Sequence, residues 1–287
     1  MSARPARIGR ARVGTARVGG APSKATRGII LGVIGAIFAI PIASMLEFTL
    51  RNGLQGGYTL SHWIGLFNPA NEAQYDVLYT GLINSLVLAV VTVAIVLCVL
   101  LPTMVLVQLR FPALRRVLEF ICIIPITVPA IVLVVGLAPI YSVVAQIFGS
   151  SVWTLAFAYG ITVLPYAYRT IQSNLGAVDV NTLSEAARSL GANWGVVFWR
   201  VLIPNLRRGI LAASFISVAV VLGEFTIASL LSRQNLQTAI LLMSQTDPYV
   251  AVIFALLALI FVFVLLVVIG GVGAAGHRGR KKKGARS

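Results

Sequence analysis

Residues 86–107 read LVLAVVTVAIVLCVLLPTMVLV, a run without a charged side chain. Residues 28–45 and 250–272 have the same character. A helix of about 20 apolar residues crosses the ~30 Å hydrocarbon core of a bilayer, whereas a surface helix of a soluble protein has a polar face. The chain is 58% hydrophobic and 11% charged, while soluble domains carry about 25% charged residues. These runs predict a protein that crosses a membrane several times.

Six apolar segments predict six transmembrane helices, and we expect an all-α membrane protein. Pro125 and Pro129 predict kinks in the third helix and Pro165 in the fourth, because proline removes a helical hydrogen bond. The expected spans, each bounded to within a few residues, are 28–48, 80–107, 117–138, 153–173, 209–231 and 250–274.

The basic residues predict the orientation in the membrane. With both termini cytoplasmic, all of the 23 Lys and Arg except Arg51 and Arg233 lie on the cytoplasmic side, as the positive-inside rule requires. We expect basic cytoplasmic tails at 1–27 and 276–287 and a transmembrane domain at 28–275. The rule also explains the net charge of +15, so we expect membrane lipids, and not nucleic acid, to contact the tails.

The segment 174–208, between the expected fourth and fifth spans, is too long and too patterned for a simple connector. Residues 182–204 read TLSEAARSLGANWGVVFWRVLIP. Thr182 and Glu185 fit a capping box that begins a short helix. Gly191 is the residue type that most often ends a helix in the left-handed conformation.

A second short helix is expected after this turn. Asn193 can cap its start, and Pro204 is expected to separate it from the fifth span. Trp194, Phe198 and Trp199 supply apolar area for docking or for packing. The pattern indicates a helix–turn–helix that projects from the cytoplasmic face, although an amphipathic helix resting on the lipid surface would share several of these features.

The segment resembles the loop signature of binding-protein-dependent ABC importer permeases. That signature reads Glu-Ala-Ala, three residues, Gly, nine residues, then Ile-x-Leu-Pro. Val201 and Ile203 stand where the signature has Ile and Leu, and the resemblance extends over residues 58–272. The residues that match at the expected spacing are Glu185, Ala186, Ala187, Gly191 and Pro204.

The resemblance implies that the first helix of the loop is a coupling helix, which sits in a groove of a cytoplasmic ATPase. It implies that Glu185 caps or pairs with the socket, that Gly191 permits the turn and that Pro204 fixes the exit direction. The small side chains of Ala186 and Ala187 would let the partner approach the backbone closely.

The resemblance also implies an assembly in a bacterial plasma (inner) membrane. Its other members are two ATP-binding cassette ATPase subunits, a second permease with which this chain is expected to form a heterodimer, and an extracytoplasmic substrate-binding protein that docks on loops 49–79 and 232–249. ATP and magnesium belong to the ATPase, so no cofactor is expected in this chain.

Two further features bear on the substrate. Gly223-Glu224-Phe225 is similar to permeases of the spermidine/putrescine type, and Asn84-Ser85 is another recurring pair of the family. We therefore take Glu224, Phe225 and Asn84 as candidate residues of the substrate pathway, since an intramembrane carboxylate faces a cavity or a partner. A polyamine is the expected substrate, with aminoethylphosphonate, iron, sulfate and thiamine as alternatives. Glu224 would equally suit a gate or a helix pair.

Other chemistry finds little support in the sequence. His62 and His277 are expected on opposite faces, and Cys98 and Cys122 lie in apolar segments, so we expect no catalytic and no metal site. The phosphate-binding pattern GxxxxGK[ST] is absent, which leaves ATP hydrolysis to a separate chain. An ion-coupled secondary transporter is the main alternative, but repeated halves with broken helices, common in that class, are not evident.

Overall fold

The computed structural model describes residues 24–53 and 56–283. These residues are almost entirely helical, and the one bridge between extended segments among them joins Arg51 to Tyr58. The prediction of an all-α protein is confirmed. The contacts divide the chain into two units, residues 1–44 and 45–287, which we describe separately.

Five helical segments of the described chain are long and apolar enough to cross a membrane. Two of them contain the expected first and second spans, a third shares residues 250–268 with the expected sixth span, and the other two differ from the expected bounds. Six spans therefore remain a prediction. The five segments are Ala25–Leu50, Pro69–Arg110, Ala130–Phe148, Trp194–Gly223 and Pro248–Val268.

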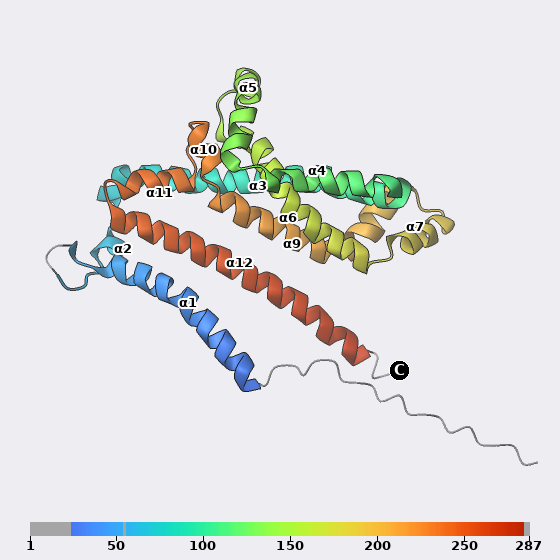
Figure 1. Cartoon of the computed structure of the whole chain (residues 1–287), viewed down its shortest axis with the longest axis horizontal. Helices are drawn as coiled ribbons and strands as arrows, with labels where there is room; N and C mark the ends of the chain where they lie inside the picture. Colours follow the sequence, from blue (N-terminus) through green and yellow to red (C-terminus); the bar gives the residue numbers. More distant parts are fainter. Residues whose placement is uncertain (1–23, 54–55, 284–287) are drawn as a thin grey trace, which may run out of the picture. The chain divides into compact units, whose positions relative to one another are not determined.

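Residues 24–44 form most of α1 (Lys24–Leu50), the expected first span. Within residues 45–287 the helices follow one another with short connections (Figure 1). Their bounds are α2 Ser61–Gly65, α3 Glu72–Arg110, α4 Arg115–Thr127, α5 Ala130–Phe148, α6 Ala156–Ala177, α7 Val180–Ser189, α8 Trp194–Val196, α9 Ile203–Gly223, α10 Thr226–Leu230, α11 Leu236–Ser244 and α12 Pro248–Lys283.

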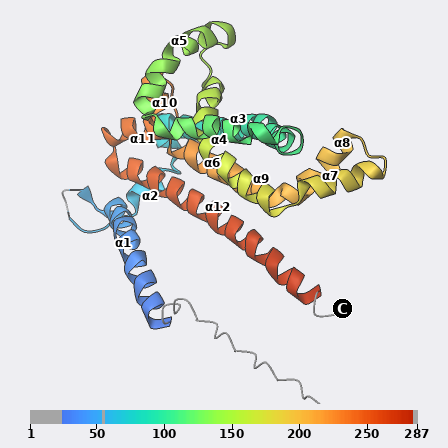
Figure 2. The same cartoon turned by 45° about the vertical axis from the view of Figure 1, so that its right-hand side comes forward.

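The prediction that residues 117–138 form one helix is wrong, because the segment is divided between α4 and α5. The chain leaves the helical conformation at Val128, with φ −98° and ψ 127°, and α5 begins after Pro129. A residue before proline is driven out of the α conformation by contact with the proline ring, so Pro129 separates two helices where a kink was expected. Pro125 lies inside α4. Both views show α5 leaving the direction of α4 (Figures 1 and 2).

The expected fourth span corresponds to α6, which has 22 residues. Its second half contains Arg169, Gln172 and Asn174, and this polarity distinguishes it from the five apolar segments. Ten of its residues are buried, because it packs against α3, α4 and α9. A helix surrounded by other helices can carry polar side chains that a lipid-facing helix cannot.

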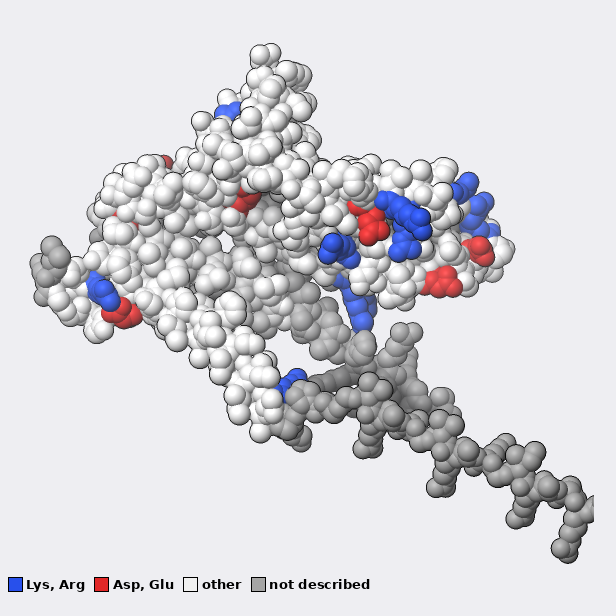
Figure 3. Space-filling view, viewed as in Figure 1, with Lys and Arg blue, Asp and Glu red and all other residues white. Residues whose placement is uncertain are grey.

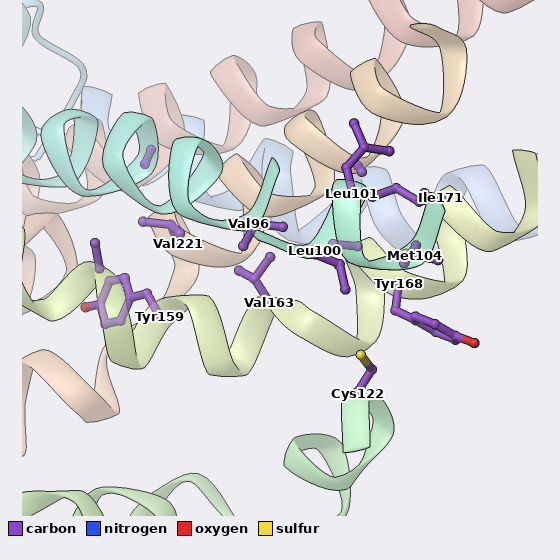
Figure 4. Packing of buried hydrophobic residues seen from close by; sticks show 14 of the residues in the cluster. Val96, Leu100, Leu101, Met104, Cys122, Tyr159, Val163, Tyr168, Ile171 and Val221 are labelled. Carbon is purple, nitrogen blue, oxygen red and sulfur yellow. The ribbon is translucent and has the colours of Figure 1, made fainter. Parts of the chain in front are cut away.

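The main core fills the space between α3, α4, α6 and α9 (Figure 4). Tyr159 and Tyr168 of α6 are its largest fully buried side chains, and Cys122 contributes from α4. A second cluster, which includes Leu78, Leu236 and Ile253, joins α3 to α11 and α12. These two clusters fix the ends of α3 and α9, where the candidate sites lie.

Candidate functional site

The helical loop begins one turn earlier than expected. Asp179 is the N-cap of α7, and its Oδ1 accepts a hydrogen bond from the backbone amide of Thr182 at 3.1 Å. The Thr182 hydroxyl donates to Asp179 Oδ2 at 2.7 Å. The predicted capping box of Thr182 with Glu185 is therefore wrong. The earlier start buries Val180 and Ser184 on one face of the helix.

The end of α7 has the predicted left-handed glycine. Gly191 has φ +86°, its amide donates to the carbonyl of Arg188, and the amide of Ala192 donates to that of Ala187. This pair of hydrogen bonds is the Schellman motif, which satisfies the last carbonyls of a helix. A side chain at residue 191 would be strained, because L-residues rarely adopt this conformation.

The outer face of α7 is free of neighbours within the described chain. Glu185 and Ala186 are exposed, and the Glu185 carboxylate makes no hydrogen bond or ion pair with any described residue. Leu190 at the tip is 89% exposed, so its apolar side chain is available for contact with a partner. Ala187 is half-buried against the core, so it lies on the inner face.

Trp194 fastens the loop to the end of α3. The guanidinium of Arg188 lies 4.7 Å from the centre of the Trp194 ring, and that of Arg110, the last residue of α3, lies 5.1 Å from it. Cations at this distance are attracted to the electron-rich ring face. Trp194 was identifiable from its place in the loop, but its two arginine partners were not, because they are far from each other in the chain.

Asn193 caps α8 as predicted, since its Oδ1 accepts from the amide of Val196 at 2.9 Å. The predicted separation at Pro204 is wrong. The helix continues from α8 through a π-helical segment, Val197–Leu202, into α9, where Pro204 is in the first turn. Proline suits a first turn, because it has no amide hydrogen to donate and the first amides of a helix lack an intrahelical acceptor.

The end of the molecule that bears α7 is strongly basic. Figure 3 shows the blue and red side chains of this end gathered near α7, with few charged groups between it and the opposite end. The arginines of these elements are Arg110, Arg115, Arg116, Arg169, Arg188, Arg200, Arg207 and Arg208. Figures 1 and 2 show α7 beyond the ends of α6 and α9.

Glu224 lies at a break in the helix and not inside a continuous span. The expected helix at 209–231 is wrong, because α9 ends at Gly223 and Glu224 is extended, with φ −81° and ψ 122°. Both carboxylate oxygens of Glu224 lie 3.1 Å from the amide of Ile227, which donates to them at the start of α10. A carboxylate is favoured there by the unpaired amides of a helix N-terminus.

Asn235 joins this break to α6 and starts α11. Its fully buried side chain donates to the hydroxyl of Tyr159 at 3.0 Å and to the carbonyl of Glu224 at 2.6 Å. Its Oδ1 accepts from the amide of Thr238, while the Thr238 hydroxyl accepts from the amide of Asn235, both at 2.9 Å. This reciprocal pair is a capping box. Sequence reasoning missed Asn235. Its spacing from Thr238 was a local signal for the cap, but Tyr159 and Glu224 lie in other elements.

Asn84 and Ser85 of α3 hold the chain on either side of Asn235. Asn84 Nδ2 donates to the carbonyl of Gln234 at 2.9 Å, and Ser85 Oγ accepts from the amide of Leu236 at 2.8 Å. The pair thus fastens the segment before α11 to α3. We call Asn84, Ser85, Tyr159, Glu224 and Asn235 the polar node. Phe225, also a pathway candidate, is 38% exposed beside it.

Residues 104–272 match the family described as the binding-protein-dependent transport system inner membrane component. This range contains the α7 loop, the helix break at Glu224 and α11. The chain belongs to this family. It is an ABC importer permease, a membrane subunit without enzymatic activity, and the alternative of an ion-coupled secondary transporter does not hold. The resemblance read from residues 182–204 is confirmed at this level.

Several relatives are named as permeases of sulfate, molybdenum or phosphate transport systems. The chain is 27% identical over 250 residues to a sulfate transport system permease protein, CysT, of Synechocystis, covering 81% of this chain and 83% of the relative. It is 32% identical over 213 residues to a molybdenum transport system permease protein, ModB, of Mycobacterium bovis, covering 67% and 78%. A phosphate transport system permease protein, PstA, of Pasteurella multocida is 34% identical over 115 residues, but the match covers only 40% of either chain.

These relatives do not support the expected polyamine substrate. The resemblance to the spermidine/putrescine branch rested on the triplet at residues 223–225, and the carboxylate of Glu224 has a partner in the backbone of α10. The sulfate alternative gains some support from the names of the relatives.

Proposed function

We propose that this chain forms, with a second permease, the membrane pathway of an ABC importer for a tetrahedral oxyanion such as sulfate, molybdate or phosphate. In the family, two ATPase subunits that bind ATP and magnesium and an extracytoplasmic binding protein complete such importers. The proposal rests on helix α7, which is exposed and has a capped start and a closed end. Such a helix offers an ATPase a preformed docking element.

The α7 loop suits a coupling role because both of its ends are fixed. Asp179 caps its start, the Gly191 turn closes its end, and Trp194 ties it to Arg110 of α3. A rigid element transmits displacement, whereas a flexible one absorbs it. The uncovered Glu185 carboxylate and the Leu190 side chain would enter the ATPase groove.

The charge distribution supports six spans with both termini in the cytoplasm. The basic end that bears α7 would face the cytoplasm, where the positive-inside rule places arginine. In this arrangement α6, the expected fourth span, joins the five apolar segments as a further span, shielded from lipid by α3, α4 and α9. The polar node then lies toward the extracytoplasmic side, about 30 Å away, the length of the 21-residue α9 at ~1.5 Å per residue.

The names of the relatives favour an oxyanion over a cation as the substrate, and the position of the Glu224 carboxylate is consistent with this choice. The Glu224 carboxylate is used in capping α10, so it does not point to an ammonium ligand. We assign Glu224, Asn84 and Asn235 to the architecture of the pathway end and not to direct recognition of a cationic solute.

The coupling role is tested with Glu185→Lys and Gly191→Asp in the complete importer reconstituted in liposomes. Uptake and binding-protein-stimulated ATPase activity should both fall at least about tenfold, as expected if roughly 1.4 kcal/mol of coupling is lost. Gly176→Ala is the matched control, because nothing lies within 4 Å of the added carbon and its φ is ordinary. Normal coupling in both loop variants would refute the role.

The substrate class is tested by uptake of labelled sulfate, molybdate, phosphate and spermidine into cells that express the whole importer. Uptake of at least one oxyanion, dependent on ATP hydrolysis, supports the proposal. Uptake of spermidine alone would restore the polyamine expectation and overturn the oxyanion assignment, leaving the family unchanged.

A further inference from the structure

A pocket of about 320 Å³ opens beside the segment between α10 and α11. Hydroxyl, amide and guanidinium groups line it together with a few apolar side chains, and none of the residues lining it is acidic. The polar lining residues are Ser229, Ser232, Arg233, Gln234 and Thr238. The functional roles described above do not use this pocket.

Arg233 gives the pocket an unneutralised positive charge. Its side chain is half-buried, and its Nε is buried without a hydrogen-bond partner. The only ion pair among the described residues joins Glu47 to Arg51, at 2.9 Å. Of the two basic residues that the charge count places outside the cytoplasm, Arg51 is therefore paired and Arg233 is not. A buried guanidinium nitrogen without an acceptor is costly unless a ligand supplies one.

The turn that presents Arg233 has an unusual residue. The amide of Ser232 donates to the carbonyl of Ser229, and the amide of Arg233 donates to that of Ala228, which is again the Schellman pattern. Ser232 stands at the left-handed position with φ 53° and is the one non-glycine residue of the described chain with positive φ. Glycine would adopt this conformation more easily, but serine adds a hydroxyl to the pocket.

The hydroxyls of Ser229 and Ser232 make no hydrogen bond to other described residues. Two free hydroxyl donors beside a guanidinium match the needs of a tetrahedral oxyanion, which offers acceptors in several directions. Gln234 is different, because its amide nitrogen already donates to the carbonyl of Val77 at 2.8 Å. That bond holds the pocket wall against α3.

We propose that Arg233, Ser229 and Ser232 form a binding site for a free tetrahedral oxyanion at the extracytoplasmic end of the pathway. The inference rests on the proposed oxyanion importer, because the charge count and that function together place the pocket where a binding protein would release its cargo. The site would receive the anion beside the polar node, before the anion enters the membrane pathway.

The site is tested by anion protection of a cysteine at Ser229→Cys, with the complete importer in phosphatidylcholine nanodiscs and without the binding protein. The rate of modification by an uncharged thiol reagent is measured in sodium sulfate, molybdate or phosphate against sodium chloride at matched ionic strength. At least one oxyanion should slow labelling about fivefold or more. Arg233→Gln should raise the anion concentration needed for half-maximal protection roughly tenfold, as expected for the loss of a charged hydrogen bond. Arg233→Lys should retain part of the protection.

Arg51→Gln is the control, since this arginine is already paired with Glu47 and should leave protection unchanged. Protection by none of the three anions, or equal protection in Arg233→Gln, would overturn the site. Added phosphatidylglycerol that protects when free oxyanions do not would assign the pocket to a lipid headgroup and also overturn it. Oxyanion uptake without protection refutes this site alone, and protection without uptake refutes the proposed substrate class alone.

Discussion

Gly81 is the position where one added methyl group should do most harm to the polar node. A Cβ at residue 81 would lie 2.6 Å from Cβ of Ala239 and 2.9 Å from the carbonyl oxygen of Asn235. Carbon atoms pack best at about 3.5–4.0 Å, so Gly81→Ala requires α3 and α11 to separate by about 1 Å. We expect a stability loss despite the better helix propensity of alanine.

The magnitude follows from two opposing effects. Replacing glycine by alanine in a helix contributes up to about 1 kcal/mol, and inserting a methyl group into a packed core costs about 1–3 kcal/mol. Here relaxation is restricted, because Asn235 is held by Tyr159 and Glu224, and the next residue is held by Ser85. We therefore expect a net loss of roughly 1–2 kcal/mol.

The assay is reversible unfolding of the detergent-solubilised chain in sodium dodecyl sulfate, with Gly136→Ala as the matched control. Gly136 lies in α5, where nothing is within 4 Å of the added carbon. The control should be neutral or slightly stabilised. If Gly81→Ala unfolds at the same detergent fraction as Gly136→Ala, the close packing of α3 on α11 is refuted.

Three other changes probe the remaining contacts. Tyr159→Phe removes the hydroxyl that accepts from Asn235 and should lower stability by about 0.6–2 kcal/mol in the same assay; no change would mean that Asn235 finds another acceptor. Trp194→Ala should raise the rate of hydrogen exchange in α7 and lower coupled ATPase activity, and Trp194→Phe should have intermediate effects. Unchanged exchange in Trp194→Ala would contradict the contact with Arg110. Hydrogen bonds from Thr182 lower the pKa of Asp179, so its cap should persist above the unfolded-state value of about 3.9 and fail as the pH falls through the lower folded value. Exchange in α7 should then rise only below about pH 4, and Asp179→Asn should abolish that rise.

The apolar helices could be predicted from the sequence because hydropathy reports which segments avoid water. Hydropathy does not report whether a segment is one helix. Pro129 gave a local signal of the first break, since the residue before it disfavours the α conformation, yet a kink was equally compatible with the sequence. At Glu224 no proline marks the break. The carbonyl of Glu224 is taken by Asn235, a residue of the next element, and sequence alone does not show this pairing.

The helix–turn–helix form of the α7 loop was predicted from the sequence, but the start of α7 and the separation at Pro204 were wrong, for a similar reason. Asp179 with Thr182 and Thr182 with Glu185 are both acceptable starts of a helix by residue type. The earlier start prevails because it buries Val180 against the main core, a tertiary contribution that no local pattern includes. The Gly191 turn was predicted because a left-handed helix end is a local requirement of the backbone.

The two candidate sites are connected by the same pair of helices. Arg110 at one end of α3 contacts Trp194 of the loop, while Asn84 and Ser85 near its other end hold the backbone around Asn235. The second helix, α9, begins in continuity with the loop and ends one residue before Glu224, whose carbonyl accepts from the same asparagine. We infer that a displacement of α7 reaches the opposite end through both helices at once. Since both converge on Asn235, relative sliding of α3 and α9 would strain its hydrogen bonds, and a rigid movement of the pair would preserve them.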